Sequence, residues 1–95
     1  MSKIYIKNPD FVQREIAGEF ILIPIKRNLK DANNLFVLNE MGAQVWKRID
    51  GTASVQKISQ NLLEEFETSP EILEKDLKTL LTDLESIQAI QLKSE

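Results

Sequence analysis

The 95-residue sequence contains no cysteine and no histidine, and these two absences exclude much of the chemistry open to a small protein. Without thiols the chain has neither disulfides nor a thiolate nucleophile. Without imidazole as well, a transition-metal site or a histidine-activated nucleophile has almost no groups from which to be built. The sequence therefore predicts a non-catalytic protein that uses no metal and no cofactor.

Long apolar runs are also missing. No stretch approaches the roughly 18 apolar residues that a membrane-spanning helix needs. The first residues, Met-Ser-Lys-Ile-Tyr-Ile-Lys, lack the apolar core and cleavage site of a signal peptide. We therefore expect one small globular domain with a cytoplasmic address and no membrane partner.

Charge is unevenly distributed along the chain. Residues 1–48 carry eight Lys/Arg against five Asp/Glu, whereas residues 49–95 carry four against ten. A basic half followed by an acidic half suits oriented binding to a partner. A solvated surface with uneven charges explains the same distribution equally well, and the sequence leaves both interpretations open.

The stretch from 35 to 51 joins a predicted strand to a predicted helix. Residues 35–38 are typical of a short strand, and Asn39 is a strong N-cap because its side-chain oxygen can accept an unpaired backbone N–H. Gly51 is suited to the left-handed backbone beyond the helix end. Between Asn39 and Gly51 the apolar residues recur at helical spacing, which predicts a helix; they are Met41, Val45, Trp46 and Ile49. We expect Trp46 to lie in the core.

Upstream of this stretch the pattern is that of a β-hairpin. Residues 11–17 alternate loosely, Gly18-Glu19 forms the expected turn, and residues 19–25 form a second strand that is apolar on both faces. Such a strand needs cover on both sides, and one layer of helices covers only one. The other side would meet the N-terminal arm, a partner protein or a second copy, so a homodimer stays open.

Downstream, two more helices are predicted, the first capped by Ser54 and the second by Ser69 with Pro70 as its first residue. Residues 88–92 alternate weakly, as in an extended tail that packs back. We predict an α+β fold of winged helix-turn-helix type, in which a three-stranded antiparallel sheet is followed by three helices. Residues 1–10 would be an N-terminal arm and residues 11–92 the domain.

Several segments together carry a resemblance to a known family. They are FILIP at 20–24, VLNEMGA at 37–43, Val45-Trp46, Asp50-Gly51, SVQKI at 54–58 and Leu80-Leu81-x-x-Leu84. This pattern, from residue 11 to about 90, resembles PqqD-like proteins, also called RiPP recognition elements. The resemblance implies a peptide chaperone that binds the leader of a ribosomally synthesised precursor peptide and presents it to a modifying enzyme, often a radical SAM protein.

The resemblance also implies where the peptide binds. In the family the leader adds as a strand to the free edge of the third strand, in a groove against the third helix, as an unpaired strand edge allows. By position the groove residues here are Leu35, Phe36, Val37, Leu38, Leu73, Asp76, Leu77 and Leu80. For any single leucine of the helix, packing in the core is favoured over contact with the peptide. Charges that could set the peptide's register are Glu74, Asp76 and Asp83, or Lys26, Arg27 and Lys30.

Three departures from the family pattern favour a product other than pyrroloquinoline quinone. The chaperones of that pathway carry an acidic residue after the strand-two proline, where this chain has Ile25, and many members have glycine where this chain has Gln88. The loop between the second and third strands is also longer and more basic. A different precursor peptide is therefore expected.

Two other function classes suit a fold of this type. A winged helix suggests DNA binding, but residues 70–87 carry five Asp/Glu against two Lys, and phosphates would repel such a helix. We therefore expect no nucleic-acid partner. A protein–protein interaction or dimerisation module without any role in peptide modification is the stronger alternative, because the apolar second strand would serve it equally well.

Overall fold

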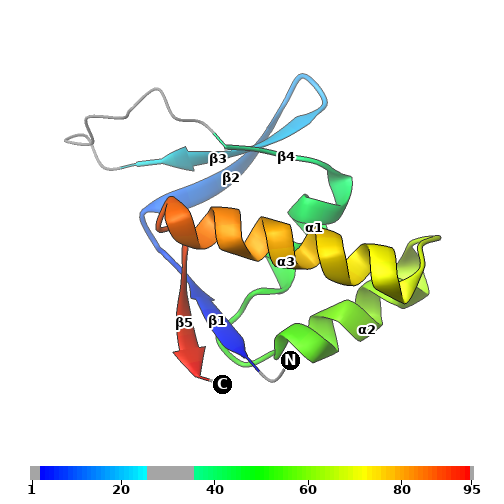
Figure 1. Ribbon diagram of the computed structural model, residues 1–95. Coiled ribbons are helices and arrows are strands. Elements are labelled where there is room, and N and C mark those ends of the chain that lie inside the picture. The colour runs from blue at the N-terminus through cyan, green and yellow to red at the C-terminus, as the bar shows by residue number, and fades with distance from the viewer. Residues whose placement is uncertain (1–2, 26–35, 95) are drawn as a thin grey trace.

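The computed structural model describes residues 3–25 and 36–94, and over these it confirms the predicted fold class (Figure 1). A three-stranded antiparallel sheet is followed by three helices, with a further strand at each end of the chain. The elements in order are β1 (Ile4–Lys7), β2 (Phe11–Ile16), β3 (Glu19–Pro24), β4 (Phe36–Leu38), α1 (Glu40–Arg48), α2 (Val55–Glu65), α3 (Pro70–Ser86) and β5 (Ile90–Ser94).

The larger sheet has the strand order β2-β3-β4, and each neighbouring pair is antiparallel. β2 and β3 form the predicted hairpin, but its turn lies at Ala17-Gly18, one residue earlier than predicted. Both residues have positive φ, 53° and 82°, and Ile16 pairs with Glu19 to close a two-residue turn. Ala17 carries no signal for a left-handed backbone, which explains why the sequence placed the turn on the glycine and its successor.

The smaller sheet joins the two ends of the chain. β1 pairs with β5, with Lys7 opposite Ile90, and Tyr5 is buried in the same core as the helices. Two contacts of Asn8 reinforce the junction, since its backbone N–H donates to the carbonyl of Ala89 and its side chain donates to the carbonyl of Gln88, each at 2.8 Å. The N-terminal residues and the C-terminal tail therefore cover each other.

Helix starts lie where the capping residues predict. The Asn39 side chain accepts the N–H of Gly42 at 2.7 Å, Ser54 accepts that of Lys57, and Ser69 accepts that of Ile72. These caps confirm the three predicted N-termini. Because a helix has a 3.6-residue repeat, the residues of α3 that share one side recur every three to four positions.

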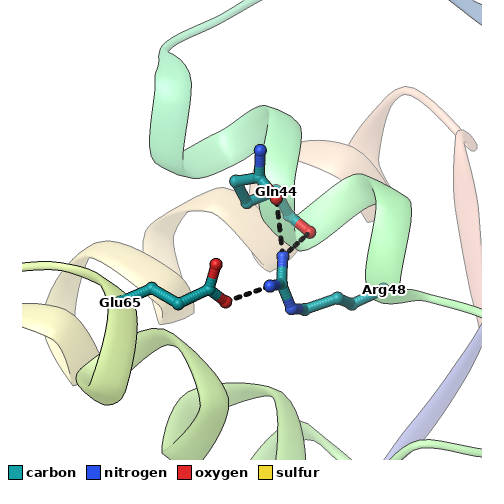
Figure 2. A network of polar contacts seen from close by, with 3 residues as sticks. All are labelled: Gln44, Arg48 and Glu65. Carbon is teal, nitrogen blue, oxygen red and sulfur yellow. Dashed lines mark hydrogen bonds and ion pairs between the residues drawn. The ribbon is translucent and has the colours of Figure 1, made fainter.

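The core lies between the inner face of the larger sheet and the helices, and α3 runs across that face (Figure 1). Trp46 is buried, as predicted, and the Lys7 ammonium lies 5.2 Å from the centre of its ring. Arg48 ties α1 to α2, because its guanidinium donates to the side chain of Gln44 at 2.7 Å and also pairs with Glu65 (Figure 2). α1 and α2 are thus joined to each other and act as one unit beside α3.

The outer face of the larger sheet carries mostly apolar side chains and is exposed only in part. Cross-strand pairing places the buried Ile21 between Arg14 and Val37 on this face, whereas Ile16 and Val37 are more than half exposed. β1 pairs with β5, so the N-terminal arm does not provide the predicted second cover. Among the described residues no layer covers this face.

Candidate peptide-binding groove

A groove of about 310 Å³ lies between β4 and α3. Its walls come from three parts of the fold, namely β4, the first turn of α1 and one stripe of α3. The lining residues are Phe36, Val37, Leu38, Asn39, Met41, Gly42, Asp76, Thr79, Leu80 and Asp83. The predicted site and this groove therefore fall at the same junction of strand and helix.

The α3 wall follows directly from helical periodicity. Its four residues have the spacing i, i+3, i+4 and i+7, which places them on one side of the helix. Leu80 is half-buried and packs against the core, so it is the deepest part of the α3 side of the groove. Asp76 and Asp83 are exposed and lie about one turn away from it on either side. The helix thus presents an apolar centre flanked by two carboxylates.

The β4 wall offers both side chains and backbone. Phe36 and Leu38 point toward the core, whereas Val37 alternates to the outer face and is 55% exposed. β4 pairs with β3 on one side, with Val37 opposite Ile21, and no strand within the described chain pairs with its other edge. The backbone groups of that edge can therefore bond to an extended chain placed in the groove.

The end of the groove near α1 depends on a glycine. A Cβ on Gly42 would lie 3.1 Å from the Asn39 side-chain oxygen and 3.3 Å from a methyl group of Leu38. Glycine therefore lets the first turn of α1 pack closely on the end of β4. Met41 fills the adjacent space and packs against the core, which adds a flexible apolar surface to the groove.

The described lining of the groove is acidic. Its ionisable groups are the carboxylates of Asp76 and Asp83, and none of the described residues that line it is Lys or Arg. Within residues 3–25 and 36–94 no three acidic side chains gather as a metal site would require. No helix in the same residues is long and apolar enough to cross a membrane. What the arrangement can do is bind an extended chain.

The structure brings together five of the eight predicted site residues. Those on the groove are Phe36, Val37, Leu38, Asp76 and Leu80. Leu73 and Leu77 instead lie in the core beneath it, with 0% and 2% of their surface exposed, and neither lines the groove. Leu35 lies outside the described residues.

Sequence reasoning did not place the residues that follow β4, or Thr79, in the groove. Asn39, Met41 and Gly42 were interpreted only as parts of a helix start, although their position directly after the edge strand was a usable signal. Thr79 was detectable from its i+3 spacing to Asp76. Asp83 was considered only as a charge that could set register, and the structure places it on the groove.

Comparison with known families identifies the chain. Residues 19–90 match the family described as "Coenzyme PQQ synthesis protein D (PqqD)". The match includes the sheet from β3 onward and all three helices. The chain belongs to the PqqD family. The family resemblance deduced from the sequence segments is thereby confirmed.

Two solved structures share the fold of this PqqD-family protein. One is TbiB1 in complex with the TbiA(beta) leader peptide, with a TM-score of 0.70, 18% identity, and coverage of 95% of this chain and 96% of that chain. The other is lasso peptide synthetase B1 complexed with the leader peptide, with a TM-score of 0.72, 18% identity, and coverage of 92% and 96%. No curated protein matches. These similarities show that the fold is shared over more than nine tenths of the chain.

Proposed function

We propose that this PqqD-family protein binds the leader of a ribosomally synthesised precursor peptide in the groove between β4 and α3. One observation carries the proposal: an edge strand with an unpaired side among the described residues lies beside a half-apolar groove. The structurally similar proteins are themselves complexes with leader peptides, which supports the assignment. In this role the protein has no catalysis of its own.

Strand addition explains how such a groove binds a peptide. Backbone bonds to β4 hold any extended chain, while every second side chain of the peptide enters the groove and is selected by its lining. β4 has only three residues, so it offers few backbone bonds, each contributing about 1 kcal/mol net. Contacts with Phe36, Met41 and Leu80 must therefore supply much of the affinity.

Presentation requires a second partner. We propose that the bound leader is delivered to a modifying enzyme in the cytoplasm, with a radical SAM protein as the first candidate because of the family. With the leader bound in the groove, the outer face of the sheet would remain accessible to the enzyme. The peptide side chains that point away from the groove would be accessible to it as well. The enzyme would then meet a surface made partly of protein and partly of substrate.

An amide NMR titration tests the binding site. The labelled protein would be titrated with synthetic peptides that tile the precursor peptide encoded beside its gene. We expect one leader segment to shift the amides of residues 36–38 together with Thr79, Leu80 and Asp83, and to leave those of α2 unchanged. Shifts confined to β1 and β5, or none with any tile, would contradict the proposal.

A methylation scan of the binding segment tests strand addition itself. Single N-methyl groups would be placed on successive backbone nitrogens of the peptide. Because alternate N–H groups of a strand point toward its neighbour, the affinity should fall with a period of two residues. A uniform small effect at all positions would show that the peptide does not bind as a strand.

Dimerisation through the outer face of the sheet is the second candidate function. Its supporting observation is the exposure of two apolar side chains, Ile16 and Val37, 51% and 55%, on the outer face of the sheet. Sedimentation velocity over a hundred-fold range of concentration decides it, with Ile16→Lys as the disrupting variant. A monomer throughout that range excludes this function.

A further inference from the structure

The groove side of α3 alternates between apolar and acidic residues. Asp76, Leu80 and Asp83 line the groove, and Ile72, which is 58% exposed and not part of that lining, precedes them by one turn on the same side of the helix. With a helical rise of about 1.5 Å per residue, the successive separations along the axis are about 6, 6 and 4.5 Å. Ile72 is thus available to contact a ligand at the start of this series.

A peptide strand has nearly the same repeat. Side chains on one face of a strand recur about every 6.7 Å, so three steps along the strand cover about 20 Å against about 16.5 Å along α3. β4 and α3 line the same groove and run side by side in Figure 1. A strand that pairs with the three residues of β4 and continues extended beyond them can therefore present one side chain to each of the four α3 residues, and a long flexible side chain can span the small mismatch.

The charge of the groove is not balanced by its own lining. Among the described lining residues Asp76 and Asp83 are the ionisable groups, and the lysines of α3, Lys75 and Lys78, do not line the groove. A ligand carboxylate would meet two like charges there, whereas a ligand cation would meet two opposite ones. The groove consequently discriminates by sign of charge as well as by shape.

Resting on the proposed function, we propose that the groove selects leader segments in which apolar and basic residues alternate on one face of the peptide strand. The motif is apolar-x-basic-x-apolar-x-basic, in either chain direction, where basic means Lys or Arg. The apolar side chains contact Ile72 and Leu80, and the basic ones pair with Asp76 and Asp83. The groove and the unpaired edge of β4 make the site, while the two carboxylates set its specificity.

A peptide selection tests the motif without requiring that the precursor be identified first. The probe is an mRNA-displayed library of random twelve-residue peptides, selected on the full chain. We expect enrichment of Lys or Arg two residues from an apolar residue and four residues from the next basic one. The same selection on the Asp76→Lys/Asp83→Lys double variant should enrich Asp or Glu at those positions instead.

Calorimetry on one selected peptide then measures each contact. Asp76→Asn and Asp83→Asn should each weaken binding about two- to five-fold, as expected for partly exposed ion pairs, and together about ten-fold. Glu74→Gln is the matched control, because Glu74 is an exposed carboxylate of the same helix outside the groove and its loss should leave affinity unchanged. Changing both basic residues of the peptide to Glu should abolish measurable binding to the natural chain.

The outcomes separate this inference from the function on which it rests. If selected peptides shift the amides of β4 and Leu80 but show no basic preference, and both Asn variants bind normally, the charge motif is wrong and peptide binding stands. If Glu74→Gln weakens binding as much as Asp76→Asn, the effect comes from overall charge and the motif is also wrong. If no peptide is enriched on the folded chain, both proposals fail.

Discussion

The two sides of α3 perform different tasks with residues that look alike in the sequence. The core side is formed by Leu73, Leu77, Leu81 and Leu84, of which none is more than 8% exposed. The groove side is formed by Asp76, Thr79, Leu80 and Asp83, with Ile72 one turn before them, and apart from the half-buried Leu80 all of these are exposed. Each residue of a helix is rotated by about 100° from the one before it, so the two sets project from different sides of α3. Stability and binding should therefore be separable on this helix.

The largest effect is expected on the core side. Leu77→Ala leaves a cavity among fully packed neighbours and should lower the free energy of unfolding by about 2–5 kcal/mol. Urea denaturation followed by the fluorescence of Trp46 measures this change. The fraction that remains folded should bind peptide with unchanged affinity, and a specific loss of affinity would place Leu77 in the binding site after all.

The matched change on the groove side is Leu80→Ala. Because Leu80 is only partly buried, the loss of stability should be smaller, about 1 kcal/mol, while peptide affinity should fall about ten-fold. Comparing the two alanine variants by denaturation and by calorimetry tests the separation directly. Equal losses of stability in both variants, with no change in affinity, would mean that the helix has no binding side.

The cap of α3 stabilises the first turn of the helix, and its loss should affect stability about as much as Leu80→Ala. Ser69→Ala removes the acceptor of the Ile72 N–H, a bond of 3.2 Å, and should lower the free energy of unfolding by about 1 kcal/mol. Ser69→Asp is the control, because aspartate keeps the acceptor and adds a favourable charge at the helix N-terminus. Thermal unfolding should therefore rank the natural chain and Ser69→Asp above Ser69→Ala.

The smallest effect is expected at Asp50, which lies on neither side of α3. Its carboxylate accepts the backbone N–H groups of Ala53 and Thr52, each at 2.9 Å, and these bonds lower its pKa from 3.8 to about 2. A depressed pKa in the folded state adds stability above pH 3.8, and this contribution disappears as the pH falls through 2.

Asp50→Asn should therefore be less stable than the natural chain at neutral pH, and the difference should shrink between about pH 4 and pH 2. Urea unfolding at several pH values measures it. Peptide affinity at neutral pH should not change, which makes this variant a control for the groove. A stability difference that is constant with pH would show that the carboxylate is not the group responsible.

Local signals predicted the elements well. Asn39, Ser54 and Ser69 each mark a helix start because a side-chain oxygen placed before an amphipathic stretch satisfies an unpaired N–H. Alternation predicted β2, a continuous apolar run predicted β3, and the turn between them was misplaced by one residue. The family could also be recognised from the sequence, because much of its pattern lies in short segments around β3, β4 and α1.

The site was predicted only in part. Phe36, Val37, Leu38, Asp76 and Leu80 reach one groove, as the family resemblance implied. Leu73 and Leu77 were assigned to it as well, since leucines on neighbouring stripes of one helix have the same signature whether they meet the core or a ligand. Exposure separates them, and exposure depends on what packs against the helix.

The amino-acid sequence by itself determined where each helix begins, which stretches are amphipathic, the excess of acid over base in α3 and the membership of the PqqD family. Only the tertiary structure decided that the two ends of the chain pair as β1 and β5, that the outer edge of β4 has no partner strand in the described chain, and which side of α3 faces it. Caps and periodicity act between residues a few positions apart, so the sequence shows them directly. Strand partners and exposed edges depend on contacts between residues far apart in the chain, and those exist only once the core has packed.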